Sequence, residues 1–410
     1  ILNVNTMNQS IPETIFSAIP MAPRDPILGI TEAFHADTNP NKINLGVGVY
    51  YDDNGKVPLL KCVQEAEKQI TALGSPHTYL PIDGLPLYDN AVQKLVFGET
   101  SDVVSQKRVA TVQAIGGTGA LKIGADFLRR FSPGSQVWIS DPSWENHRAL
   151  FEYAGFKVNT YPYYDPATRG VDFSGMSDTL KALPAGSIIV LHACCHNPTG
   201  ADLSDAQWDE IIDIVKTRKL IPFLDMAYQG FSEGIESDGR IVRRFSSQYT
   251  PVLVSNSFSK SFSLYGERVG AFSIVAGNAD EAARTLSQLK RIIRTNYSNP
   301  PIYGAKIVAT VLANPELRQM WENELTSMRV RIHEMRHKLA DELTARKYGQ
   351  DFSFITRQNG MFSYSGLTPE QVERLKNEFS VYIVSTGRVC VAALNSHNLD
   401  YVVNAISSVL

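Results

Sequence analysis

Short apolar runs rich in Val and Ile alternate with segments of helical periodicity from about Arg108 onward, and this alternation restricts the possible folds more than any other feature. Parallel strands need a long crossover connection, usually a helix, so the pattern predicts βαβ units around a mostly parallel sheet flanked by helices. The predicted strands are residues 108–115, 136–140, 188–193, 220–224, 252–255 and 269–275.

Two helices between these strands are predicted from local patterns. A tight turn is expected at 116–119, and the helix after it should bury one face made of Leu121, Gly124, Leu128 and Phe131. Ser204 and Gln207 have the spacing of a capping box, in which each side chain binds the backbone N–H of the other residue. The buried stripe of this second helix should consist of Trp208, Ile211, Ile212 and Val215.

The length of 410 residues favours two domains. After Pro301 the pattern changes to a long charged helical segment over 315–346, followed by short strands near 352–364 and 382–393. We predict a large domain over residues 58–320 and a smaller α/β domain built from residues 7–57 and 321–410. Residues 1–6, ahead of Met7, could be an added remnant or could be native.

Composition excludes several classes of function. Lys and Arg number 39 against 42 Asp and Glu, a formal charge of −3, so the chain lacks the basic excess that nucleic acid binding requires. No apolar run approaches the ~20 residues that span a bilayer. No signal or transit segment is recognised, so a cytoplasmic location is expected. Four cysteines in so long a chain argue against a disulfide framework and indicate reduced thiols.

A glycine-rich segment, Gly116-Gly117-Thr118-Gly119, follows the first predicted strand. Free backbone N–H groups at the start of a helix suit a phosphate, but the segment could equally be only a tight turn. It fails the dinucleotide fingerprint, because Lys122 stands where the third glycine belongs, and it lacks the ending of a Walker loop. A dinucleotide-dependent oxidoreductase is therefore excluded.

His192, Cys194 and His196 alternate along a predicted strand and could suggest a metal site. Alternation leaves these side chains along a line, whereas zinc prefers a tetrahedron, so no metal is predicted. Asn197-Pro198 is typical of a turn, and the Asn197 amide could alternatively point at a ligand oxygen.

Asp225 and Lys260 each follow an apolar strand. A carboxylate at a buried strand end needs a positive partner, so Asp225 could be part of an internal salt bridge, a helix cap or a binding site that includes Tyr228. Lysines usually lie on the surface, but Lys260 lies between a buried strand and small polar residues, with Arg268 eight positions later. This setting favours a buried, reactive amine.

A phosphate cradle, a carboxylate for a protonated ring nitrogen, a phenol and an amide for a ring oxygen, and an amine for a Schiff base are the requirements of pyridoxal 5'-phosphate. Over nearly its whole length the chain resembles the fold-type I aminotransferases of the aspartate and aromatic amino acid group. The resemblance is carried by INLGVGVY (43–50), YLPIDG (79–84), GGTG (116–119), DPSW (141–144), HNPTG (196–200), SFSK (257–260), YSNPP (297–301) and GR (387–388).

The resemblance implies roles around the cofactor ring. Lys260 is expected to form the internal aldimine and then to shuttle a proton between the substrate and the cofactor. Asp225 should keep the ring nitrogen protonated, so that the ring accepts electrons. Tyr228 and Asn197 should bind the ring oxygen, and Trp144 should stack on the ring.

The resemblance also implies contacts to the cofactor phosphate and to the substrate. His147 should support Asp225, and the phosphate should be held by Gly117, Thr118, Ser257, Arg268 and Tyr79 of the partner subunit. The substrate α-carboxylate should bind Arg388, with help from Asn197, Trp144 and the backbone of Gly48. Arg294 is expected to reach a side-chain carboxylate across a subunit interface. Sites shared in this way imply a homodimer.

The implied activity is ping-pong transamination between aspartate or aromatic amino acids (Tyr, Phe, Trp) and 2-oxoglutarate. Tyr51 and Val57 should make the entrance apolar, whereas Val49, Thr118 and Asn299 are aspartate-like, so dual specificity is expected, with Arg294 swinging away for aromatic side chains. The alternatives are a lyase or decarboxylase on the same fold and a catalytically silent homologue. A second carboxylate clamp argues against a lyase, and intact Lys260, Asp225 and Arg388 argue against a silent homologue.

Overall fold

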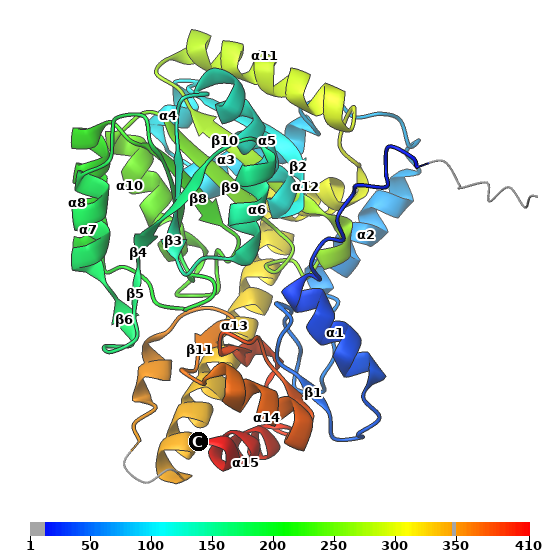
Figure 1. Cartoon of the computed structure of the whole chain (residues 1–410). Coiled ribbons are helices and arrows are strands. Elements are labelled where there is room, and N and C mark those ends of the chain that lie inside the picture. The colour runs from blue at the N-terminus through cyan, green and yellow to red at the C-terminus, as the bar shows by residue number, and fades with distance from the viewer. Residues whose placement is uncertain (1–12, 347–349) are drawn as a thin grey trace, which may run out of the picture.

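The computed structural model describes residues 13–346 and 350–410, so residues 1–6 lie outside the described part of the chain. Its main element is a seven-stranded sheet in the order β2-β10-β9-β8-β7-β3-β4 (Figure 1). Every neighbouring pair is parallel except those of β10, which is antiparallel to both β2 and β9. The strands are β2 (Val109–Ile115), β3 (Val137–Asp141), β4 (Val158–Pro162), β7 (Ile188–His192), β8 (Ile221–Met226), β9 (Val252–Ser257) and β10 (Val269–Val275).

All six predicted strands are therefore present, and β4 is the strand that the sequence pattern missed. β4 is an edge strand with polar residues at Asn159 and Thr160, so it lacks the continuous apolar run of a central strand. β8 is longer than expected, which places Asp225 inside the strand instead of after it.

Helices cover both faces of this sheet (Figure 1). Alternate strand residues point into two separate cores, as Val190 and Leu191 of β7 do. One core contains α5 (Gly116–Phe131), α6 (Glu145–Tyr153) and α11 (Ala279–Asn296). The other contains α3 (Pro86–Phe97), α7 (Phe173–Lys181), α8 (Asp205–Arg218), α10 (Arg240–Gln248) and α12 (Tyr303–Ala313).

Two details of α5 differ from the prediction. Residues 116–119 form the first turn of the helix, so they are not a separate tight turn. Phe131 is 49% exposed, because it is the last helical residue and its side chain lies at the edge of the core. The other three residues predicted for that face are buried.

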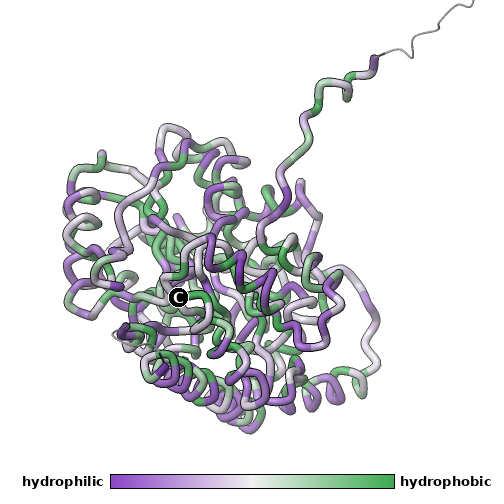
Figure 2. Tube along the Cα trace, turned by 60° about the horizontal axis from the view of Figure 1, so that its bottom comes forward, coloured by the Kyte–Doolittle hydropathy of each residue, from purple (hydrophilic) through white to green (hydrophobic). Residues whose placement is uncertain are grey.

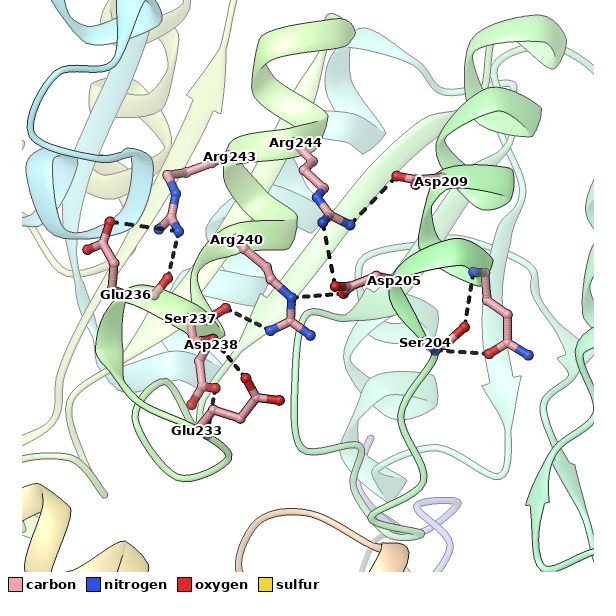
Figure 3. Close-up of polar contacts among 11 residues, drawn as sticks. Ser204, Asp205, Asp209, Glu233, Glu236, Ser237, Asp238, Arg240, Arg243 and Arg244 are labelled. Atoms are coloured by element: carbon pink, nitrogen blue, oxygen red, sulfur yellow. Dashed lines mark hydrogen bonds and ion pairs between the residues drawn. The ribbon is translucent and has the colours of Figure 1, made fainter.

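The predicted capping box begins α8 (Figure 3). The stripe of four apolar residues predicted for this helix is buried. The Ser204 hydroxyl accepts from the Gln207 N–H at 3.2 Å, and the Gln207 amide oxygen accepts from the Ser204 N–H at 2.9 Å. The first turn is also tied to α10, because Asp205 pairs with Arg240 at 2.9 Å and with Arg244 at 3.6 Å. These contacts fix the position of α8 relative to α10.

A smaller group of helices and short strands lies beside the part of the chain that contains the sheet, and α13 (Pro315–Arg346) connects the two (Figure 1). This helix is continuous through the predicted domain boundary at residues 320–321. Distant segments pair here: β1 (Ile43–Asn44) with β12 (Val381–Tyr382), and β11 (Phe362–Tyr364) with β13 (Arg388–Cys390). Around them lie α1 (Pro26–Ala36), α14 (Pro369–Phe379) and α15 (Leu399–Val409). The strand expected from residue 352 is instead a 3₁₀ helix, η2 (Ser353–Arg357), followed by β11. The domain limits themselves stay a prediction.

Among the described residues no helix is both long and apolar enough to cross a bilayer. All four cysteines are buried and none forms a disulfide within residues 13–346 and 350–410.

The burial of Asp89 in α3 leads us to expect that the free energy of unfolding depends on pH. It is 8% exposed, and its Oδ1 has no hydrogen-bond partner among the described residues. Burial, together with the charge of Asp83, raises the pKa of Asp89 to about 9. A raised carboxyl pKa means that the folded state is favoured at low pH and loses stability as the pH rises, by at most about 1.4 kcal/mol per pH unit up to the folded-state pKa.

We therefore expect D89N to raise the thermal midpoint at pH 8 and to change it little at pH 4.5. The measurement is thermal unfolding of the parent and the variant across this pH range. The exposed Asp102 supplies the control, because D102N should leave the midpoint unchanged at both pH values. A D89N midpoint that is below that of the parent at pH 8 would contradict the prediction.

Candidate active site

A cavity of about 420 Å³ lies where β7, β8 and β9 end and α5 begins. In sheets of this kind the carboxyl ends of parallel strands are the usual place for a ligand. The cavity gathers most of the residues that the sequence singled out, namely Gly48, Gly117, Thr118, Trp144, Asn197, Asp225, Tyr228, Ser257, Lys260, Arg268 and Arg388.

One end of the cavity is built for an anion. The first turn of α5 leaves the N–H groups of Gly117 and Thr118 outside the helical hydrogen-bond ladder, at the positive end of the helix dipole. Arg268 lies against this turn, since a Cβ at Gly116 would be 2.3 Å from its Nη2. Its Nη1 donates to the Tyr265 carbonyl at 3.0 Å, and it forms no ion pair with a carboxylate in the described part of the chain. Ser257 lies beside Gly117, because a Cβ there would be 3.2 Å from the Ser257 Cβ.

Asp225, in the same cavity, is held by a chain of part-buried hydrogen bonds. His147 Nε2 donates to Asp225 Oδ2 at 2.7 Å, and His147 Nδ1 is bonded to the Ser143 hydroxyl at 2.8 Å. That hydroxyl is also 3.1 Å from His192 Nε2. Burial on its own raises the pKa of Asp225, but the hydrogen bond and charge of His147, with smaller effects of His192 and Lys260, outweigh it and lower the pKa below its usual value. The carboxylate is therefore charged at neutral pH.

Lys260 follows β9 and faces the same cavity. Its Nζ lies 5.2 Å from the centre of the Tyr228 ring. Burial lowers the pKa of Lys260 to about 8; Asp225 opposes this change, and the charges of Arg268 and Arg388 add to it. An amine with such a pKa is deprotonated in a useful fraction of molecules near neutral pH, and only the neutral amine is a nucleophile or a base.

Arg388 of β13 brings a second cation to the cavity. Its Nη1 donates to the Asn197 amide oxygen at 3.0 Å and its Nη2 to the Gly46 carbonyl at 2.8 Å. The guanidinium lies over the Phe362 ring at 4.1 Å from the ring centre, and Nε has no partner among the described residues. A buried guanidinium with no carboxylate partner is suited to bind a carboxylate in two-pronged fashion.

These groups fit pyridoxal phosphate. The cavity is lined by an anion cradle made of Arg268 and of backbone N–H groups without helical partners, by a charged carboxylate, and by an amine of lowered pKa. Trp144 borders the cavity at the start of α6, with its ring edge-on to His147 at 5.3 Å between centres.

Tyr79 and Arg294 do not lie in this cavity. Tyr79 is 88% exposed and lines a separate surface cavity of about 720 Å³, together with Asn299 and residues 300–303. Arg294, near the end of α11, is exposed and donates to the Ser298 hydroxyl at 2.7 Å. Within one copy of the chain, neither residue lines the cavity that contains Lys260.

The cavity also has walls that the sequence patterns did not indicate. Phe362, Tyr265 and Leu28 line it, and the Tyr265 hydroxyl accepts from the Tyr50 N–H at 2.9 Å. Tyr265 is five residues after Lys260, and this short distance in the sequence could have indicated that Tyr265 lies near the site. Phe362 and Leu28 come from distant segments and had no local signal.

Comparison with known proteins agrees with this geometry. The family model of class I and II aminotransferases matches residues 40–406. The chain is 60% identical to an aspartate aminotransferase of Pseudomonas aeruginosa, over 97% of this chain and 100% of that protein. It is 51% identical to an aromatic-amino-acid aminotransferase of Escherichia coli, over 94% and 98%.

Among solved structures, an aromatic-amino-acid aminotransferase of Burkholderia pseudomallei, covalently bound to pyridoxal phosphate, superposes with a TM-score of 0.95 at 62% identity. The match covers 97% of this chain and 100% of that one. Sequence, fold and cavity thus agree, and the chain belongs to the class I and II aminotransferases.

Proposed function

We propose that this aminotransferase uses pyridoxal phosphate to move an amino group from aspartate or an aromatic amino acid to 2-oxoglutarate by a ping-pong mechanism. The supporting observation is that one cavity is bordered by Lys260, by Asp225 and by Arg388, whose guanidinium forms no ion pair with a carboxylate of the described residues. In each half-reaction an amino group and a hydrogen are exchanged for a carbonyl oxygen, so the two half-reactions balance without an oxidant. The relatives named above are aminotransferases, which does not favour the lyase alternative.

When bound, the cofactor would supply an electron sink that makes the α-carbon of the amino acid more acidic. Lys260 in its neutral form would take the proton from this α-carbon onto Nζ and would then pass it to the cofactor, so that the amine is neutral again at the end of the half-reaction. Asp225, held by His147, stabilises positive charge on the ring nitrogen. Tyr228 and Asn197 orient the ring oxygen, while Trp144 covers one ring face.

The remaining residues position the reactants. Arg388 binds the α-carboxylate, assisted by Asn197, Trp144 and the backbone of Gly48. The anion cradle of Gly117, Thr118, Ser257 and Arg268 holds the cofactor phosphate.

We propose that two copies of the chain complete each other's sites. Tyr79 would contact the cofactor phosphate in the partner subunit, and Arg294 would contact the side-chain carboxylate of the substrate there. Exposed apolar side chains support this assembly, since the described chain begins with a segment that projects away from the body (Figure 2), and Ile15, Phe16, Ile19 and Met21 are exposed. The cytoplasmic location stays a prediction.

Dual specificity is supported by the entrance to the site. Val49, Tyr51 and Val57 line a hollow of about 510 Å³, and Tyr265 borders both this hollow and the cavity with Lys260. The side chains of Tyr51 and Val57 favour aromatic substrates, although Glu67 and Glu267 also border the hollow. Arg294 is exposed within one copy of the chain, so it can exchange its hydrogen bond to Ser298 for another contact by a change of rotamer.

The test is a half-reaction followed by absorbance. We expect aspartate, tyrosine and phenylalanine each to convert the bound cofactor from its pyridoxal to its pyridoxamine form. In R294A the kcat/KM for aspartate should fall about 100-fold, because a charge pair is lost, and the value for phenylalanine should change little. R291A, on the same helix, is the control and should resemble the parent. Discharge by aspartate alone would refute dual specificity, and a cofactor that no donor discharges would refute transamination.

A further inference from the structure

A buried arginine on α13 forms no ion pair among the residues that the structure describes. Arg336 is 1% exposed and is among the largest fully buried side chains of the described chain. It forms no ion pair with any carboxylate within residues 13–346 and 350–410. Burial lowers the pKa of Arg336 to about 10, so the side chain still carries its charge at neutral pH. The charge of Asp202 opposes this effect of burial, although the two side chains form no ion pair. A buried cation without an ion-pair partner is costly, so its hydrogen bonds need to be strong and well placed.

The partners of Arg336 come from one short segment. Its guanidinium donates to the carbonyls of Gly360 and Phe362, the latter at 3.1 Å, and to the hydroxyl of Ser363. A longer contact of 3.5 Å reaches the Ile355 carbonyl. The planar, forked guanidinium can hold several carbonyls in fixed directions, which a lysine ammonium cannot. A side chain of the long helix therefore holds residues 360–363 in place, together with the pairing of β11 with β13.

That segment forms a wall of the active site. The Phe362 ring lies 4.1 Å from the Arg388 guanidinium, measured from the ring centre, and edge-on to Tyr228 at 5.9 Å between centres. It also limits the backbone at Gly48, where a Cβ would be 3.0 Å from the Phe362 Cζ. The neighbouring Asn359 N–H donates to the Gly200 carbonyl at 2.7 Å, which joins the segment to the loop of Asn197.

We propose that Arg336 is a positioning residue for the substrate carboxylate: by fixing residues 360–363 it holds Phe362 beneath Arg388 and so sets the direction of the Arg388 guanidinium. Arg336 does not line the cavity and acts through Phe362. This inference rests on the proposed function, because it takes Arg388 as the group that binds the α-carboxylate.

The holoenzyme tests this proposal through binding as well as turnover. In R336M we expect the KM for the amino donor, and the Kd for succinate as an unreactive dicarboxylate, to rise about 10- to 100-fold, because a displaced carboxylate site loses its alignment. The kcat should change less than about threefold, since the groups at the α-carbon are untouched. R336K should retain part of the affinity. Succinate binding is measured by the change in protein fluorescence and by calorimetry.

A double-mutant cycle with F362L separates positioning from general stability. Because Arg336 acts through Phe362, R336M/F362L should bind succinate no more weakly than the worse single variant. Effects that multiply would overturn the proposal, and so would an unchanged succinate Kd in R336M. If R336M does not fold, R336K and the R336K/F362L pair answer the same question.

Two further variants separate the inference about Arg336 from the proposed role of Arg388. R329M removes an arginine of the same helix that donates to the Gly230 carbonyl, and it should leave succinate binding unchanged. R388K should weaken succinate binding strongly. If R388K does not, the proposed function of Arg388 fails; if R388K weakens binding and R336M does not, only the inference about Arg336 fails.

Discussion

Lys260→Ala should lower kcat by about 10⁵- to 10⁶-fold, as expected for loss of the group that carries out the covalent and proton-transfer steps. The physical reason is that, among the described residues that line this cavity, Lys260 is the only one with an amine side chain, whereas Arg268 and Arg388 carry guanidinium groups. The pKa of Lys260, lowered by burial to about 8, is what makes its amine available near neutral pH.

The measurement combines steady-state kinetics with mass spectrometry. Borohydride reduction of the parent should attach the cofactor covalently to the peptide that contains Lys260, and the variant should show no such adduct. Cofactor should still bind K260A without a covalent bond, because the anion cradle at the start of α5 is intact. Lys216→Ala, an exposed lysine of α8, is the matched control and should keep full activity. An active K260A enzyme, or an adduct on another lysine, would refute the assignment.

Much of this fold was predictable because its patterns are local. Strands that are buried on both faces give nearly continuous apolar runs, which is why the parallel strand at 188–193 and the antiparallel strand at 269–275 were both recognised. The capping box at Ser204 depends on residues three apart, so it too could be recognised from sequence. β4 was missed because it lies at an edge of the sheet, where Asn159 and Thr160 interrupt the apolar run that would have identified a strand.

The ligand-facing residues at strand ends were predictable for a similar reason. Asp225 and Lys260 are charged residues close to apolar strand segments, where charged side chains are unusual, and this can be seen from the sequence alone. Their meeting in one cavity follows from the shared direction of β8 and β9.

Residues that act through tertiary contacts could not be found in this way. Arg336 lies in a charged helical segment in which several other arginines are exposed or half-buried. The atoms that accept its hydrogen bonds belong to residues 355–363, which are distant from it in the helix pattern. Phe362 is one aromatic residue among many until β11 pairs with β13 and brings it to Arg388. Tyr79 and Arg294 gain their expected roles only from a second copy of the chain.

The second large effect is expected at Asp225. We expect D225N to lower kcat about 10²- to 10³-fold, because a fixed charge aimed at the developing charge of the reaction is removed while the shape is kept. D225E keeps the charge but not the distance to His147, and it should fall between the parent and D225N. H147A should reduce activity less than D225N, because Asp225 then loses its 2.7 Å donor but not its own charge.

The control for D225N is a buried carboxylate outside the cavity. Asp238 accepts the backbone N–H groups of Gly230, Ser232 and Glu233 at 2.8–3.0 Å, and D238N should cost stability with little change in kcat. Thermal unfolding and kcat are measured for both variants.

The pH profile gives a second readout of Asp225. Its pKa lies below the usual carboxyl value, so the charge, and the activity that depends on it, should persist as the pH falls until the folded-state pKa is reached. Without His147 the effect of burial is no longer outweighed and the pKa should rise, so H147A should lose activity at a higher pH than the parent. An H147A profile identical to that of the parent at acid pH would mean that the 2.7 Å hydrogen bond does not control the charge of Asp225.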